Sequence, residues 1–179
     1  MMIKIKGRKY KADLLFLGNK DRKKLRSLFI IWKRLFVGLR NFNSRGVTIP
    51  EGISESAFAL VMQCPRIIKV YGAKCSFDNF DLKGNKRLQI KATSVDNDLT
   101  SFGPNSVWDE LYWLDFYRKG KLDGSFDVYK IPNRVIYNFK VNATQTFRQQ
   151  QKNKRRPRLR MRYDIIIPKK IKPVCRCRI

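Results

Sequence analysis

The sequence contains no histidine among its 179 residues. Without an imidazole side chain, four kinds of site are excluded: a Ser-His-Asp triad, a histidine general acid–base pair, a histidine-dependent nuclease site and a Cys-His zinc site. The chain also lacks any apolar run near the ~20 residues that span a bilayer, and its basic N-terminus lacks the apolar core of a signal peptide. We therefore expect a cytoplasmic protein without a membrane partner.

Acidic residues are scarce as well. Fourteen Asp and Glu stand against forty Lys and Arg, which gives a formal net charge of +26. A surface this basic attracts polyanions, and nucleic acid is the most common of these. Hydrophobic residues make up 43% of the chain and aromatic residues 12%, which is typical of a folded protein and not of a disordered basic tail.

The few acids are concentrated in the middle of the chain. Eleven of the fourteen lie between Glu51 and Asp127, whereas residues 1–40 and 148–179 each hold thirteen Lys and Arg. Carboxylates repel phosphates, so a simple nucleic-acid clamp has little use for such a cluster. An enzyme that holds Mg²⁺ against a phosphate does need one.

Four cysteines are present: Cys64, Cys75, Cys175 and Cys177. One C-x-C pair and two isolated residues do not match the spacing of a zinc ribbon. We expect free thiols, as in a reducing cytoplasm.

Hydrophobic periodicity predicts two helices in the first third of the chain. Residues 19–42 place apolar side chains on one face and Lys and Arg on the other, which favours packing on a core over binding at a membrane surface. The second helix is expected over 54–63, with Ser54 as its N-cap and Pro65 beyond its end. The apolar stripe of the first helix consists of Leu25, Leu28, Phe29, Trp32, Leu35, Phe36 and Leu39.

A third helix is predicted from Asn105 or Ser106 to about Gly120, with Asp109 and Glu110 in its first turn, where acids favour the helix dipole. Its aromatic residues are expected to pack in a core or a dimer interface. Strands are predicted at 73–82, 87–94, 126–131 and 162–167.

The order of these elements predicts an α/β protein, bordering on α+β, with a mixed central sheet flanked by helices. No internal repeat or long linker divides the chain, and its length suits one domain. We expect a single domain, 1–179, made of a basic N-terminal helical region (1–48), a core (49–130) and a basic C-terminal segment (131–179).

The stretch SFDNFDLKGNKRLQIKATS, residues 76–94, carries the candidate chemistry. Gln89 and Lys91 are two positions apart on a predicted strand, so both side chains point to the same face. An acid on the preceding strand, either Asp78 or Asp81, can lie beside them because adjacent strands are ~5 Å apart. Carboxylate and amide oxygens suit Mg²⁺, and a lysine beside the ion can position water or offset charge on a phosphate.

This stretch resembles the PD-(D/E)XK nuclease motif, in which an acid precedes a strand that bears acid-x-Lys. The resemblance makes Asp78 the leading acid, with Asp81 as the alternative, and puts Gln89 in the second acidic place and Lys91 in the lysine place. No proline precedes Asp78, and the amide of Gln89 lowers the charge at the metal. Members of this superfamily often add an acid from a preceding helix, and Glu55, on the predicted helix before this stretch, matches that acid in order and in context.

The flanking segments extend the resemblance from about Ile49 to Ile167. QIKATSVDNDLTSFGPNSVWDELYWLDF, DGSFDVYKI and TFRQQQKNKRRPRLR resemble the type II restriction endonucleases that cut GC-N-GC. The resemblance implies a PD-(D/E)XK restriction-endonuclease-like core and Mg²⁺-dependent hydrolysis of double-stranded DNA, with Mn²⁺ able to substitute. It implies Asp78, Gln89, Lys91 and Glu55 as the catalytic set, and Asp78, Gln89 and Glu55 as metal ligands.

Base recognition requires side chains that reach the DNA grooves, and two segments offer them. Arg grips guanine bidentately, and Gln and Asn pair with adenine, although most contacts in such interfaces reach phosphates. The candidate DNA-binding residues are Thr100, Ser101, Asn105, Ser106, Gln149, Gln150, Gln151, Arg155, Arg156, Arg158 and Arg160.

A palindromic site implies a homodimer with one active site per strand. A restriction enzyme also implies a cognate DNA methyltransferase in the same system, which protects the host without forming a stable complex. Two alternatives stay open: a structure-specific PD-(D/E)XK nuclease, such as a junction resolvase or nickase, and a non-catalytic basic nucleic-acid-binding protein.

Overall fold

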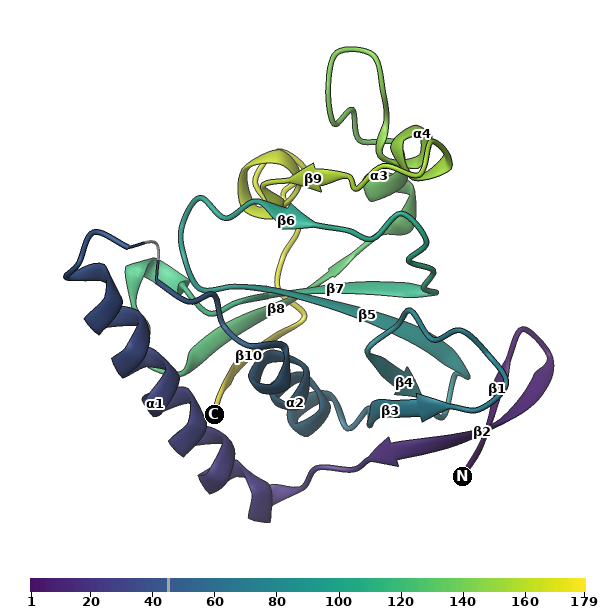
Figure 1. The fold of residues 1–179 in the computed structure, drawn as a ribbon, viewed down its shortest axis with the longest axis horizontal. Coiled ribbons are helices and arrows are strands. Elements are labelled where there is room, and N and C mark those ends of the chain that lie inside the picture. Colours follow the sequence, from purple (N-terminus) through teal and green to yellow (C-terminus); the bar gives the residue numbers. More distant parts are fainter. Residues whose placement is uncertain (45) are drawn as a thin grey trace.

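An eight-stranded sheet runs through the protein in the spatial order β1-β2-β3-β4-β5-β7-β8-β10 (Figure 1). The computed structural model describes residues 1–44 and 46–179; Arg45, within the expected 1–48 region, lies outside the described residues. Strands β5 and β7 pair in parallel and the other neighbours are antiparallel, so the sheet is mixed, as predicted. The strands are β1 (Met2–Ile5), β2 (Arg8–Leu15), β3 (Arg66–Val70), β4 (Asn79–Asp81), β5 (Lys86–Thr93), β7 (Glu110–Asp115), β8 (Ser125–Ile131) and β10 (Cys175–Arg178).

Two helices, α1 (Asn19–Arg40) and α2 (Glu51–Met62), pack against one face of this sheet. The helix predicted over 19–42 is confirmed, and Leu25, Phe29, Trp32 and Phe36 of its predicted stripe are buried with residues of β5, β7 and β8. The stripe is wrong for Leu28 and Leu35, which lie on the solvent side of the helix and are 45% and 52% exposed. Within the residues described, no helix is both long and apolar enough to cross a bilayer.

The start of α2 differs from the prediction. The helix begins at Glu51, directly after Pro50, and Ser54 lies inside it, where its hydroxyl donates to the carbonyl of Pro50 at 3.4 Å. Proline is favoured at a helix start because it has no N–H to leave unpaired. The earlier start brings Glu51 into the first turn and moves Glu55 to the second.

The opposite face of the sheet is covered by short elements from the second half of the chain. Trp108, Leu111, Trp113 and Phe102 form a second core with them, so the predicted packing role of these aromatic residues is confirmed. The covering elements are the two-stranded pair β6 (Thr100–Ser101) and β9 (Arg158–Leu159), the helices α3 (Asn133–Tyr137) and α4 (Phe147–Lys152), and the π-helix η2 (Met161–Ile166).

The helix predicted from Asn105 to Gly120 is wrong: Glu110–Asp115 forms strand β7, and a short 3₁₀ helix, η1 (Arg118–Gly120), follows it. β7 lies between β5 and β8 and is buried on both faces. A strand of this kind shows a continuous apolar run without polar alternation, and helical spacing fits such a run equally well. Asp109 and Glu110 therefore do not begin a helix; they pair with Arg87 and Lys86 across the strands, at 2.6 Å in each case.

The strand predicted at 162–167 is also wrong. This segment forms η2, in which Ile165 and Ile166 are both buried. Neighbouring residues of a strand point to opposite faces, whereas a helical turn can bury two neighbours on one side. Asp164 stabilises the turn by accepting from the backbone N–H of Arg160 at 2.7 Å.

The C-terminal strand β10 pairs antiparallel with β8 at the end of the sheet. Its residues Cys175 and Cys177 form a disulfide, so the expectation of free thiols is wrong for this pair. Cys64 and Cys75 are free, as expected.

Candidate active site

The hairpin of β4 and β5 places Asp78 against the two residues at the centre of the motif. Asp78 directly precedes β4, and its N–H donates to the carbonyl of Leu88 at 3.0 Å. Its Oδ2 accepts from the backbone N–H of Ile90 at 2.7 Å and from Nε2 of Gln89. The leading acid of the motif and the amide of β5 are therefore in direct contact.

Asp81 lies elsewhere in the hairpin. It pairs with Lys86 at the turn end of β4, and its Oδ1 accepts from the backbone N–H of Lys83 at 2.9 Å. This is the hydrogen bond of an aspartate that stabilises its own turn. Of the two candidate acids, the structure brings Asp78 to Gln89 and leaves Asp81 in the turn.

A pocket of about 290 Å³ opens beside β5 and collects most of the other candidates. Lys91 reaches its wall from β5, and its Nζ lies 5.8 Å from the centroid of the Phe102 ring. Glu55 reaches the wall from α2 and is 8% exposed. Charged and hydroxyl residues that line the pocket are Thr48, Glu51, Ser54, Glu55, Lys91, Asp98, Thr100 and Ser101.

Gln89 supplies the observation that bears on a metal ion. The residue is 4% exposed, and its Oε1 has no hydrogen-bond partner among the described residues. A buried acceptor without a donor is costly, and a cation would satisfy it. The Asp78 carboxylate beside it completes a pair of oxygen donors, which suits a hard ion that keeps several water ligands. In the described part of the chain, no three His, Cys, Asp or Glu side chains are placed to hold a metal together.

The carboxyl groups of this site are easier to protonate than usual. Burial, and after it the charge of Glu55, raise the pKa of Asp78 to about 7, against the opposing effect of the N–H of Ile90. Burial also raises the pKa of Glu55, against the lowering effect of Arg66. Perturbed carboxyl groups that converge on a pocket are typical of functional sites.

Glu55 has a strong partner that the sequence did not indicate. Its Oε2 accepts from Arg66 of β3 twice, from Nε at 3.0 Å and from Nη2 at 2.5 Å. The arginine thereby fixes the carboxylate at the pocket wall and occupies one of its two oxygens.

Glu51 is a second residue that sequence reasoning missed. It lines the pocket from the first turn of α2, and its charge raises the pKa of both Glu55 and Asp78. Glu51 and Glu55 are four positions apart, the spacing of neighbours on one helix face. The E-x-x-x-E pattern after Pro50 was a usable signal.

The two segments with candidate DNA-binding residues pair with each other. β6 and β9 are antiparallel, with Ser101 opposite Arg158. Thr100 and Ser101 line the pocket beside β5, and the hydroxyl oxygens of both are buried without a partner among the described residues. Arg158 lies in an adjoining groove of about 800 Å³, which shares Thr48, Asp98, Leu99 and Ser101 with that pocket and is also lined by Arg40.

Several of the remaining candidates have structural partners. Gln149 caps α4 through the N–H and hydroxyl of Thr146, at 2.7 and 3.0 Å. Gln150 is buried. Arg160 pairs with Asp164 at 3.0 Å. Arg155 and Arg156 are exposed and extend from the same segment into solvent.

A second cavity, of about 480 Å³, lies between α4 and the segment that follows β6. Asn105 and Ser106 line it together with Gln151, whose Nε2 donates to the carbonyls of Gly103 and Ser106 at 3.0 and 3.4 Å. The structure thus brings the two predicted recognition segments into one place.

Comparison with protein families matches residues 17–168 to the Bsp6I restriction endonuclease family. The type II restriction enzyme Bsp6I of Bacillus sp. (strain RFL6) is 32% identical over 151 residues, which cover 83% of this chain and 82% of that enzyme. No solved structure matches the chain. The matched region begins at residue 17 and includes α1, which lies outside the resemblance seen in the sequence alone.

Proposed function

The chain belongs to the Bsp6I restriction endonuclease family, and from this premise we propose that it is a Mg²⁺-dependent type II endonuclease that cuts both strands of DNA at a short palindrome, GC-N-GC. The family supplies the reaction class, which is hydrolysis of DNA. The observation that carries the finer proposal is the contact between Asp78 and Gln89, whose buried Oε1 has no donor among the described residues.

The residues of the pocket, together with the Asp78–Gln89 pair next to Ile90 of its wall, fit the parts of such a reaction. Asp78, Gln89 and Glu55 would hold Mg²⁺, which supplies positive charge to the phosphate and makes bound water more acidic. Lys91 places its ammonium on the same face of β5 as Gln89, where it orients the attacking water and offsets the charge that develops on the phosphate. Arg66 keeps Glu55 in position.

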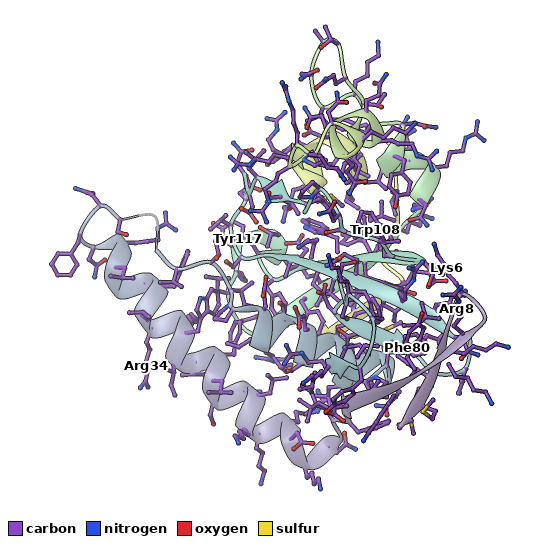
Figure 2. All side chains as sticks on the ribbon, turned by 45° about the vertical axis from the view of Figure 1, so that its right-hand side comes forward. Lys6, Arg8, Arg34, Phe80, Trp108 and Tyr117 are labelled. Atoms are coloured by element: carbon purple, nitrogen blue, oxygen red, sulfur yellow. A yellow bond between two sulfur atoms is a disulfide. The ribbon has the colours of Figure 1, made fainter. Side chains whose placement is uncertain are left out.

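A cut through both strands of a palindrome takes two copies of one active site, so we propose a homodimer. α1 offers the surface for it. Leu28, Ile31 and Leu35 are 45%, 62% and 52% exposed along one side of this helix, and such apolar patches mark interaction sites. Arg34 points away from the sheet on that side (Figure 2). Phe36 and Arg40 of the same helix line the groove that joins the catalytic pocket, so pairing through α1 would bring together the two helices that border the grooves.

Plasmid cleavage tests the proposal. Purified protein with Mg²⁺ should give discrete fragments, EDTA should abolish them, and the fragment ends should share one consensus. Lys91→Ala and Asp78→Ala should lose cleavage and keep specific binding, whereas Asp81→Ala should cut.

Each alternative has its own outcome in the same experiment. A gel shift without cutting would identify a non-catalytic binder. Cutting that depends on a branched or nicked substrate would identify a structure-specific nuclease. If Asp81→Ala is inactive and Asp78→Ala cuts, the leading acid is Asp81.

A further inference from the structure

The second cavity contains one arginine whose surroundings suit it to reading a base. Arg148 lies on α4 and lines the cavity together with Asn105 and Lys152. Its guanidinium carbon lies 5.3 Å from the centroid of the Tyr137 ring. This residue belongs to the basic C-terminal segment, but its position is distinct from the exposed run Arg155–Arg156.

The aromatic residues beneath Arg148 form a fixed support. The Tyr137 ring stacks on Trp108 with centroids 5.5 Å apart and planes inclined by 10°. Nε1 of Trp108 donates to Oδ1 of Asn133 at 2.9 Å, and Phe147 contacts both rings edge-on. Figure 2 shows Trp108 at the boundary between the sheet and the layer that carries α4. A guanidinium on such a stack keeps its plane and loses little conformational entropy when it binds.

The glutamines next to Arg148 have other partners. Gln149 caps the helix, Gln150 is buried, and Gln151 ties α4 to the carbonyls of Gly103 and Ser106. The three glutamine side chains are therefore engaged within the protein. Arg148 is exposed and lines the cavity, so its guanidinium N–H groups are available to bind DNA.

The cavity also lies near the catalytic pocket. Ser101 lines that pocket and Asn105, four residues later, lines the cavity. Four residues span at most about 14 Å. Base pairs follow one another at about 3.4 Å along each strand, so the facing walls of the pocket and the cavity are separated by no more than about four base-pair steps, the scale of a short recognition site.

We propose that Arg148 is a specificity-determining residue that reads a guanine through its O6 and N7 atoms in the major groove, with Tyr137 as its positioning residue. Guanine is the base with two adjacent major-groove acceptors, and arginine is its usual bidentate partner. Lys152, on the same wall, contacts a neighbouring phosphate. This inference rests on the proposed function, because a base reader needs a sequence-specific enzyme around it.

The experiment first maps the cut site of the wild-type protein from its fragment ends. Binding to a duplex with that site and to a scrambled duplex is then measured with Ca²⁺ in place of Mg²⁺, so that no cleavage intervenes. Arg148→Ala should weaken binding to the site by about 5- to 150-fold, the range of one bidentate base contact, while binding to scrambled DNA changes only as much as in Arg155→Ala. Arg148→Lys keeps the charge and should lose specificity as Ala does.

Two further arms locate the contact. Replacing each guanine of the site in turn with 7-deazaguanine should weaken the wild type at one position of each half-site and leave Arg148→Ala unaffected there. Tyr137→Leu should reduce specificity and Tyr137→Phe should retain it. Melting temperatures show whether each variant folds. If Arg148→Ala does not fold, the binding data for Arg148→Lys test the inference.

Equal losses on specific and scrambled DNA would identify Arg148 as a phosphate contact and overturn the inference. So would an Arg148→Lys variant with wild-type specificity. If the wild type yields no consensus cut, the proposed function fails first, and that result is seen before any Arg148 variant is tested.

Discussion

At the scale of single residues, Asp78 sets a pH dependence that can be measured without DNA. Burial raises its pKa to about 7, from an ordinary value of 3.8. The folded state therefore binds more protons than the unfolded state between pH 4 and 7, so the free energy of unfolding falls as pH rises through this window. Above it, the buried carboxylate destabilises the protein.

Asp78→Asn should remove this penalty. An asparagine accepts from the N–H of Ile90, and its amide can donate to the free Oε1 of Gln89 once that side chain flips. In urea unfolding without divalent ions, the variant should match the wild type at pH 4. It should exceed the wild type at pH 8 by on the order of 2–4 kcal/mol. Asp81→Asn is the matched control and should follow the wild-type profile. A wild type as stable at pH 8 as at pH 4 would contradict the burial of this charge.

The centre of the site could be predicted from the sequence because the pattern that indicates it is local. Gln89 and Lys91 share a face by strand alternation alone, and Asp78 lies on the preceding run of the same hairpin. Arg66 could not be placed in this way, because its pair with Glu55 depends on how α2 packs on β3. Glu51 shares a helix face with Glu55 by spacing alone, but its effect on Asp78 depends on how α2 packs on the hairpin, which is a tertiary contact.

At the scale of secondary-structure elements, one ion pair joins η2 to the centre of the sheet. Nη2 of Arg162 donates to both oxygens of Asp115, at 2.6 and 2.8 Å. Asp115 is 5% exposed and ends β7. Removing one partner of a buried pair leaves the other charge without compensation.

Arg162→Ala should therefore lower the free energy of unfolding by about 3–5 kcal/mol, as measured by urea denaturation at pH 7. Adding Asp115→Asn should restore part of that loss. Arg160→Ala is the control from the same turn. Arg160 pairs with Asp164, but the Arg160 side chain is about half exposed. Its removal should therefore lower the free energy of unfolding by no more than about 1 kcal/mol. Similar losses for both arginines would show that the Asp115 pair is not effectively buried.

α1 was predicted well because it is long and has one polar side: Lys and Arg meet solvent while Leu25, Phe29, Trp32 and Phe36 meet the core. The β4–β5 hairpin was predicted from its turn residues and from the alternation of apolar and polar residues, although both faces of β5 are largely buried. β7 is buried on both faces, and η2 buries the neighbours Ile165 and Ile166, so neither apolar run carries a period that distinguishes strand from helix. The conformation of β7 is decided by its neighbouring strands β5 and β8, and that of η2 by its contact with Asp115.

At the scale of the whole molecule, the homodimer makes a prediction about salt. The apolar side chains Leu28, Ile31 and Leu35 stand among Lys and Arg of α1, so two copies of this helix repel each other at low ionic strength. Screening weakens that repulsion. Dimer affinity should therefore rise with salt, in contrast to DNA affinity, which should fall.

Light scattering across a salt series measures the dimer directly. Ile31→Gln with Leu35→Gln should weaken dimerisation at least tenfold and keep the melting temperature of the monomer. Ile68→Gln, at an exposed apolar position on β3, should leave the dimer intact. A wild type that stays monomeric at every salt concentration, with and without DNA, would contradict pairing through α1.

The sequence by itself determined the basic character of the protein, the exclusion of histidine chemistry, the hairpin with Asp78, Gln89 and Lys91, and the core-facing side of α1. Each of these follows from composition or from a period within one segment. Tertiary structure alone decided the strand β7, the π-helix η2, the Arg66–Glu55 pair and the cavity in which Arg148 meets Asn105. Each of these depends on contacts between residues distant in the chain, for which no local pattern exists.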